Sequence, residues 1–153
     1  MPNRRSTITM SEEEMYSFLD GQKTMNVATI GPNGWPHLVA MWYCSLGDDL
    51  VFWTFGKSQK AINLRRDPRL TVLVEDGETY ETLRGVQLQC RARLVETPEE
   101  VIAIGTGLLA KYMPGAAQQE QEVFLRTAPK RIGVHLTIEH STSWDHHKLG
   151  GVY

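Results

Sequence analysis

The chain lacks long hydrophobic runs and carries little net charge. Its apolar stretches are strand-sized, well short of the roughly 20 residues that cross a membrane as a helix. No apolar segment follows the basic residues 1–5, as it would in a signal peptide. The formal net charge is −2, which argues against a nucleic-acid-binding surface. We therefore predict a cytoplasmic protein with no membrane span and no nucleic-acid partner.

Cysteines are also scarce, and the histidines form no ligand pattern. Cys44 and Cys90 lie far apart in apolar segments, so we expect two buried free thiols. His135 and His140 would face opposite sides of a regular strand, and the histidines at 146–147 also diverge. A Gly-x-Ser-x-Gly nucleophile motif is absent. The sequence predicts neither a metal site nor a hydrolase.

The length of 153 residues is typical of one domain. We expect a flexible N-terminus at residues 1–10 and a single domain at 11–153. Apolar Val86, Leu88 and Cys90 alternate with polar residues, and a period of two predicts a half-buried strand. By such patterns strands are expected at 24–30, 37–46, 50–55, 70–75, 86–94 and 131–139, and helices at 11–21, 60–66, 97–112 and 115–127.

The order of these elements favours a barrel. Tight turns join the first three strands, which should therefore be antiparallel neighbours. The β-α-β alternation of a parallel sheet is missing. Six half-buried strands are typical of a small closed barrel, so the fold class is mainly β with helices.

A concentration of positive charge marks the start of the helix expected at 60–66. Ser58 is a good N-cap residue, and Lys57 and Lys60 flank it. A helix N-terminus carries partial positive charge and normally attracts acidic side chains, so the two lysines do not stabilise it. Together with the free N–H groups they favour a bound phosphate. The alternative is a solvated basic face.

Six aromatic residues gather on or near the second and third expected strands. Most would belong to the core or to a subunit interface, although such rings could also flank a planar ligand beside the anion site. They are Trp35, Trp42, Tyr43, Phe52, Trp53 and Phe55.

The chain resembles the flavin/deazaflavin oxidoreductase superfamily, the pyridoxamine 5′-phosphate oxidase-like split β-barrels. Residues 55–60, Phe-Gly-Lys-Ser-Gln-Lys, resemble the Ser-x-Lys element that binds the cofactor phosphate in that family. Residues 63–69, Asn-Leu-Arg-Arg-Asp-Pro-Arg, resemble a continuation common in actinobacterial members, many of which use coenzyme F-420. Residues 143–150 resemble the same group. The resemblance extends from residue 11 to the end of the chain.

The resemblance implies a six-stranded antiparallel split β-barrel that forms a homodimer, with two cofactor sites at the dimer interface. Ser58 and Lys60 would hold the cofactor phosphate, with Lys57 and Asn63 close by. Thr54 would contact the ribityl-phosphate region.

Two further segments would contact the cofactor ring in such a dimer. The backbone of Val39, Ala40 and Met41 would run along the ring edge. Trp144 would approach the ring from the other subunit.

The chain departs from the family pattern at the second strand. Oxidases of pyridoxamine phosphate carry an Arg-x-x-x-Lys element there, whereas residues 37–43 contain neither arginine nor lysine. The basic ending of those oxidases is also missing. These departures favour a deazaflavin-dependent reductase over a vitamin B6 oxidase, with FMN as the alternative cofactor.

Coenzyme F-420 carries a phosphate and an oligoglutamate tail, so its binder should offer a basic groove. Lys57 and Lys60 could form one with Arg65, Arg66 and Arg69. The alternative is that the three arginines are solvated or bind carbonyls at the end of their helix.

The predicted function is a coenzyme F-420-dependent oxidoreductase that transfers a hydride to a small electrophilic organic substrate. Four residues are open candidates for a proton donor: Tyr43, Tyr80, Tyr112 and His37. The alternative is an FMN-binding oxidoreductase, or a flavin- or haem-binding carrier without fast turnover. A third hypothesis is a structural barrel that binds a partner.

Overall fold

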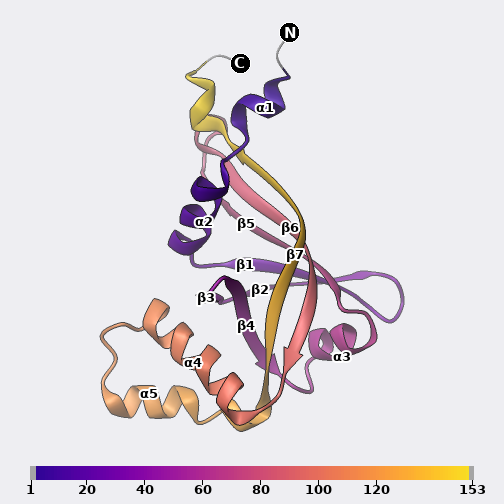
Figure 1. Ribbon diagram of the computed structural model, residues 1–153, viewed down its shortest axis with the longest axis vertical. Coiled ribbons are helices and arrows are strands. Elements are labelled where there is room, and N and C mark those ends of the chain that lie inside the picture. The colour runs from indigo at the N-terminus through magenta and orange to yellow at the C-terminus, as the bar shows by residue number, and fades with distance from the viewer. Residues whose placement is uncertain (1–2, 152–153) are drawn as a thin grey trace.

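The computed structural model describes residues 3–151, and in them seven strands form one antiparallel sheet with helices around it (Figure 1). The strands are β1 (Met25–Ile30), β2 (Pro36–Met41), β3 (Cys44–Leu46), β4 (Asp49–Phe55), β5 (Arg69–Asp76), β6 (Arg84–Val95) and β7 (Arg131–Asp145). The helices are α1 (Arg4–Ile8), α2 (Glu12–Gly21), α3 (Gln59–Arg66), α4 (Pro98–Tyr112) and α5 (Gln118–Leu125), with short 3-10 helices η1 (Tyr80–Thr82), η2 (Ala128–Lys130) and η3 (His146–Leu149).

The strands are ordered β2-β1-β5-β6-β7-β4-β3, and every neighbouring pair is antiparallel. The expected class, mainly β with helices, is confirmed. The expected count of six strands is wrong, because the described residues contain seven.

The extra strand arises from a break in the segment expected to run over 37–46. The Tyr112 hydroxyl accepts the Tyr43 N–H at 3.1 Å and lies 3.0 Å from the Tyr43 carbonyl oxygen. Tyr43 is thus bonded to a side chain instead of a neighbouring strand. The segment divides into β2, which pairs with β1, and β3, which pairs with β4. The expected pairing of the second and third strands is therefore correct for β3 and wrong for β2.

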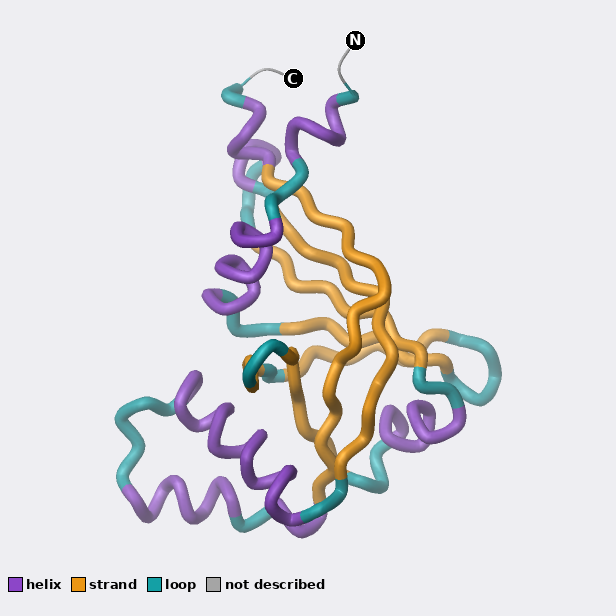
Figure 2. The backbone as a smooth tube through the Cα atoms, viewed as in Figure 1, coloured by secondary structure: helices purple, strands orange, loops and turns teal. Residues whose placement is uncertain are grey.

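The break also determines how the sheet curves. Although β2 and β3 are its two edge strands, only residues 42–43 separate them. Met41 and Cys44 can therefore be at most about 11 Å apart. The sheet must curl to satisfy this, and it forms the half-barrel seen in Figure 2.

Both faces of β4 are covered, which explains its continuous apolar sequence. Leu50 and Phe52 belong to the core inside the curled sheet, with α2 and strands β1, β5, β6 and β7. Val51 and Trp53 belong to a second core against α4. The two cores fix the end of β4, where the chain turns into α3.

The two ends of the described chain lie side by side, with α1 next to η3 (Figure 1). Lys148 Nζ donates to the Thr9 carbonyl at 2.9 Å and to Glu14 at 2.6 Å. Ser11 caps α2 with the reciprocal bonds of a capping box, as the sequence predicts. The segment expected to be flexible contains a helix, and its flexibility stays a prediction. Within residues 3–151, none of the helices is long and apolar enough to cross a membrane.

Candidate anion and cofactor site

Three of the predicted phosphate-binding residues meet where β4 turns into α3. Ser58 caps the helix, and its Oγ accepts the Ala61 N–H at 3.3 Å. The Thr54 hydroxyl lies 3.1 Å from Ser58 Oγ, and Lys60 Nζ donates to Thr54 at 3.1 Å. We call Thr54, Ser58 and Lys60 the anion corner. Its hydroxyls, ammonium and helix N-terminus provide the donors that a phosphate requires.

The Lys60 ammonium has no carboxylate partner among the described residues. Burial, and secondarily the positive charge of Arg131, lower the pKa of Lys60 below its ordinary value. A bound anion would relieve both effects. The local charge is thus unbalanced in favour of an anionic ligand.

Arg131 is a component of this site that the sequence analysis missed. Its guanidinium lies 4.1 Å from the centre of the Phe55 ring and 4.6 Å from that of Trp53. Its Nε donates to Thr127 at 2.9 Å, and burial lowers the pKa of the arginine. Arg131 pairs with Phe55 across β7 and β4. That register, which no local pattern indicates, brings the arginine to the corner.

The three arginines that the sequence suggested for a basic groove are bonded to other groups of the protein. Arg65 donates to the Gly56 carbonyl at 2.6 Å and to Glu96 at 2.9 Å. Arg66 donates to the Ile30 carbonyl, and Arg69 pairs with Asp67 at 2.7 Å. These three side chains stabilise the ends of α3 and β1 rather than forming an open cationic surface.

Other cations line a cavity of about 740 Å³ next to the corner, together with one carboxylate, that of Glu96, which pairs with Arg65. Lys57 and Lys130 line it, and both are exposed without a carboxylate partner among the described residues. Arg131 lines it as well. A second acidic group of a ligand could therefore lie next to one held at the corner.

Asn63 contributes to the fold of this region. It is completely buried; its Nδ2 donates to Thr29 at 3.0 Å, and its Oδ1 accepts from Gln59 at 2.8 Å. The side chain fastens α3 to β1, so it supports the position of the helix.

The residues expected along the cofactor ring lie on β2 and β7. Val39, Ala40 and Met41 are on β2, which has no strand partner on its outer edge in the described sheet. Trp144 is near the end of β7, opposite the end that carries Arg131 (Figure 1). One chain therefore does not bring Trp144 to its own anion corner, and its predicted contact requires a second subunit.

Three of the remaining candidate groups, Cys44, Cys90 and Tyr43, are buried. Burial raises the pKa of Cys44 to about 11 and that of Cys90 to about 12, and both cysteines are free, as predicted. Tyr43 donates to the Leu19 carbonyl, and burial raises the pKa of both Tyr43 and Tyr112. These two tyrosines are poor proton donors. In the described part of the chain, no cluster of three or more His, Cys, Asp and Glu residues could hold a metal ion.

The aromatic residues fall into two groups. Tyr43, Phe52 and Trp53 are buried in the cores. Trp35, Trp42 and Phe55 are substantially exposed. Of this second group, Phe55 borders the cavity beside the corner.

The chain is similar to known proteins in both sequence and structure. The family model described as pyridoxamine 5′-phosphate oxidase matches residues 11–145. A crystal structure of a conserved hypothetical protein from Mycobacterium tuberculosis is 42% identical, with a TM-score of 0.90, and the match covers 97% of this chain and 93% of that one. A comparison with curated proteins found no match.

More distant structures share the fold. One is described as an F420 reductase, at 22% identity and a TM-score of 0.68, covering 86% of this chain and 98% of that one. Another is a haem storage protein from Vibrio cholerae, at 15% identity and a TM-score of 0.68, covering 88% of this chain and 93% of that one.

Proposed function

Because this chain belongs to the pyridoxamine 5′-phosphate oxidase family, within the flavin/deazaflavin split-barrel superfamily, we propose that it is an oxidoreductase that uses coenzyme F-420. The anion corner would hold the cofactor phosphate. The observation that carries the proposal is Lys60: its partly buried ammonium bonds a hydroxyl beside a helix N-terminus and has no carboxylate partner among the described residues.

The choice of coenzyme F-420 over FMN rests on the surroundings of the corner. FMN offers one phosphate, whereas coenzyme F-420 adds the carboxylates of its tail. Lys57, Lys130 and Arg131 around the neighbouring cavity could bind those carboxylates. In addition, β2 has the sequence Pro-His-Leu-Val-Ala-Met and lacks the paired basic residues of the oxidases.

When bound, the reduced cofactor would supply a hydride to a small electrophilic substrate. The protein's own residues bind and orient. Ser58 and Lys60 anchor the phosphate, the free edge of β2 at Val39–Met41 offers backbone groups to the ring, and Trp144 of a second copy covers it. Fixing both reactants in this way lowers the entropic part of the barrier.

A homodimer follows from this arrangement, because Trp144 lies at the far end of β7 from the corner. The substrate would be a small molecule, and the cytoplasm would be its compartment.

The second candidate function is a flavin or haem carrier, or an FMN-dependent oxidoreductase. The engaged hydroxyls of Tyr43 and Tyr112 favour the carrier, because they leave the site without either tyrosine as a proton donor. The two functions differ in turnover. A carrier would retain reduced cofactor in the presence of electron acceptors, whereas a reductase would oxidise it.

The proposal is tested by titrating the protein with coenzyme F-420 and with FMN, followed by cofactor fluorescence or calorimetry. We expect tighter binding of the deazaflavin. Lys60→Met should weaken that binding roughly tenfold or more, because it removes a charge-assisted contact of about 1.5–3 kcal/mol. Lys23→Gln, a lysine outside the corner, is the control and should bind normally. Normal binding by Lys60→Met would refute the anion corner.

A further inference from the structure

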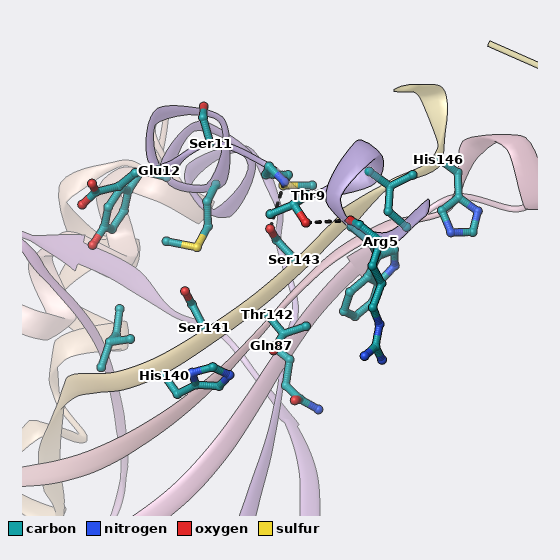
Figure 3. A pocket seen from close by; sticks show the side chains of 16 residues that line it. Arg5, Thr9, Ser11, Glu12, Gln87, His140, Ser141, Thr142, Ser143 and His146 are labelled. Carbon is teal, nitrogen blue, oxygen red and sulfur yellow. Dashed lines mark hydrogen bonds between the residues drawn. The ribbon is translucent and has the colours of Figure 1, made fainter. Parts of the chain in front are cut away.

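A cavity of about 1080 Å³ lies at the opposite end of the molecule from the anion corner. One wall is the segment from Arg5 to Tyr16, and the other is the second half of β7, from Ile138 to Trp144 (Figure 3). The volume slightly exceeds the range of about 300–1,000 Å³ that is typical of small-molecule sites. Hydrogen bonds hold the walls together: Ser143 Oγ accepts the Met10 N–H at 3.0 Å, and Lys148 bonds the Thr9 carbonyl.

The sequence of β7 changes character where it enters this cavity. From Ile132 to Ile138 apolar residues alternate with others, but residues 139–143 read Glu-His-Ser-Thr-Ser. Ser141 pairs with Leu88 and Ser143 with Val86, and both partners are completely buried. The serines therefore occupy positions on the core side of the sheet, where an apolar residue is normal.

The strand geometry changes at the same place. A register shift at Gln89/Cys90 leaves Glu139 as an extra residue, as in a β-bulge. Beyond Leu136, β7 has no pairing with β4, so one edge of residues 137–145 is free of a strand partner in the described sheet. Polar side chains on both faces and a free edge together make a wall suited to a polar ligand.

The cavity also has an apolar, planar surface. Trp144 lies against Gly85, and a Cβ at Gly85 would come within 2.4 Å of the indole. Met10, Met15 and Ile138 line the same space. A ligand could thus stack a flat apolar body on the indole while its polar end reaches the hydroxyls.

The charges that line the cavity are unevenly placed. Figure 3 shows Arg5 at the end near His146, while Glu12 lies at the opposite end. The Arg5 guanidinium has no hydrogen bond or ion pair with any residue that the structure describes, and neither has the exposed His140 ring. An unpaired guanidinium with five donors matches a carboxylate in particular.

We propose that this cavity binds an organic acid with a planar apolar body, and that Arg5 selects it by binding its carboxylate. The planar part lies on Trp144, and the hydroxyls of Ser141 and Thr142 are within the same lining. As a statement about the substrate, this inference rests on the proposed function, because Trp144 is also the residue that would cover the cofactor ring. As a statement about binding, it is independent of any cofactor.

The test uses 2-naphthoate and its uncharged methyl ester, titrated into the full chain without cofactor and followed by naphthalene fluorescence. The acid should bind more tightly than the ester. Arg5→Gln should weaken binding of the acid roughly tenfold and leave the affinity for the ester unchanged, so the preference for the acid over the ester disappears. Arg5→Lys, which keeps the positive charge, should retain part of that preference.

The matched control is Arg4→Gln, which removes the same charge from the same helix outside the cavity lining. If Arg4→Gln and Arg5→Gln weakened binding of the acid equally, the proposal would be overturned, because the overall positive charge of the helix would then explain the effect. Equal binding of acid and ester, or binding of neither, would overturn it as well. A melting temperature for each variant separates lost binding from lost folding.

Cofactor titrations on the same variants keep the two proposals distinct. Normal coenzyme F-420 binding by Arg5→Gln, with loss of the acid preference, is the expected result. Failure of the wild-type chain to bind any cofactor would refute the proposed function and leave the acid test intact.

Discussion

At the scale of single residues, the two thiols are distinguished by how strongly they resist ionisation. Both are buried, and desolvation raises the pKa of Cys44 to about 11 and of Cys90 to about 12, from 9.0. The thiolate is the reactive form of cysteine. Neither thiol is therefore activated as a nucleophile in the folded protein, in keeping with the proposal that a bound cofactor supplies the chemistry.

These pKa values predict a loss of stability at alkaline pH. Between pH 9 and 11 the unfolded chain releases the Cys44 proton and the folded chain keeps it, so the free energy of unfolding falls as pH rises. The limiting slope is about 1.4 kcal/mol per pH unit for one thiol. Urea unfolding of the wild type and of Cys44→Ala at pH 8 and pH 10 measures it.

The substituted chain should lose less stability over that interval than the wild type. Lys111 acts in the opposite direction, because burial lowers its pKa and its contribution to stability rises with pH. Equal pH dependence of the two proteins would show that Cys44 ionises alike in the folded and unfolded chains.

The part of the site that could be predicted from the sequence consists of residues that lie close together along the chain. Ser58 and Lys60 follow directly after β4, so a cap and a basic first turn sufficed to place them at one point. Arg131 could not be found in this way. It reaches the corner through its pairing with Phe55, and its neighbours in sequence carry no sign of that register.

At the scale of elements, the helices and most strands followed from local patterns. The helices expected at 11–21 and 97–112 correspond to α2 and α4, which Ser11 and Thr97 cap, and α3 ends at Arg66 as expected. The break between β2 and β3 did not follow. Trp42 and Tyr43 are residues that favour strands, and neither glycine nor proline marks the break. Its cause is Tyr112, which lies on α4 and bonds the Tyr43 backbone.

The pairing of Gly85 with Trp144 gives a prediction for β6 and β7. Gly85→Ala would place a methyl group 2.4 Å from the indole, so the ring must move. We expect a loss of about 1–3 kcal/mol of stability from this overpacking. Because Trp144 is proposed to cover the ring, the affinity for coenzyme F-420 should fall although the anion corner is untouched.

Thermal unfolding and a cofactor titration measure the two effects. Gly21→Ala is the control, since a Cβ there meets no atom within 4 Å. If Gly85→Ala lost stability but kept full cofactor affinity, Trp144 would have no role at the ring.

At the scale of the whole molecule, the proposed cofactor site requires two copies of the chain. The anion corner and Trp144 lie at opposite ends of β7, so the proposed site would combine the corner of one copy with Trp144 of the other. One chain has a mass of 17.3 kDa, so light scattering distinguishes a monomer from a dimer.

We expect a mass of twice that value and a cofactor affinity that decreases on dilution. Dissociation would separate the phosphate-binding residues from the partner's ring-covering residue, so each monomer should bind weakly. Light scattering and cofactor fluorescence over a dilution series measure both quantities together. A monomer that binds coenzyme F-420 with undiminished affinity would contradict the composite site.

The sheet order has a further consequence, for how the chain reaches its native state. β7 lies between β6 and β4 although it is the last strand in sequence, and its residue His135 contacts Asp49 across 86 positions. Contacts of such long sequence separation form slowly, since a large loop must close first. During synthesis β4 has to wait for β7 before its second edge is paired, so nascent chains expose an open strand edge until the last strand has emerged.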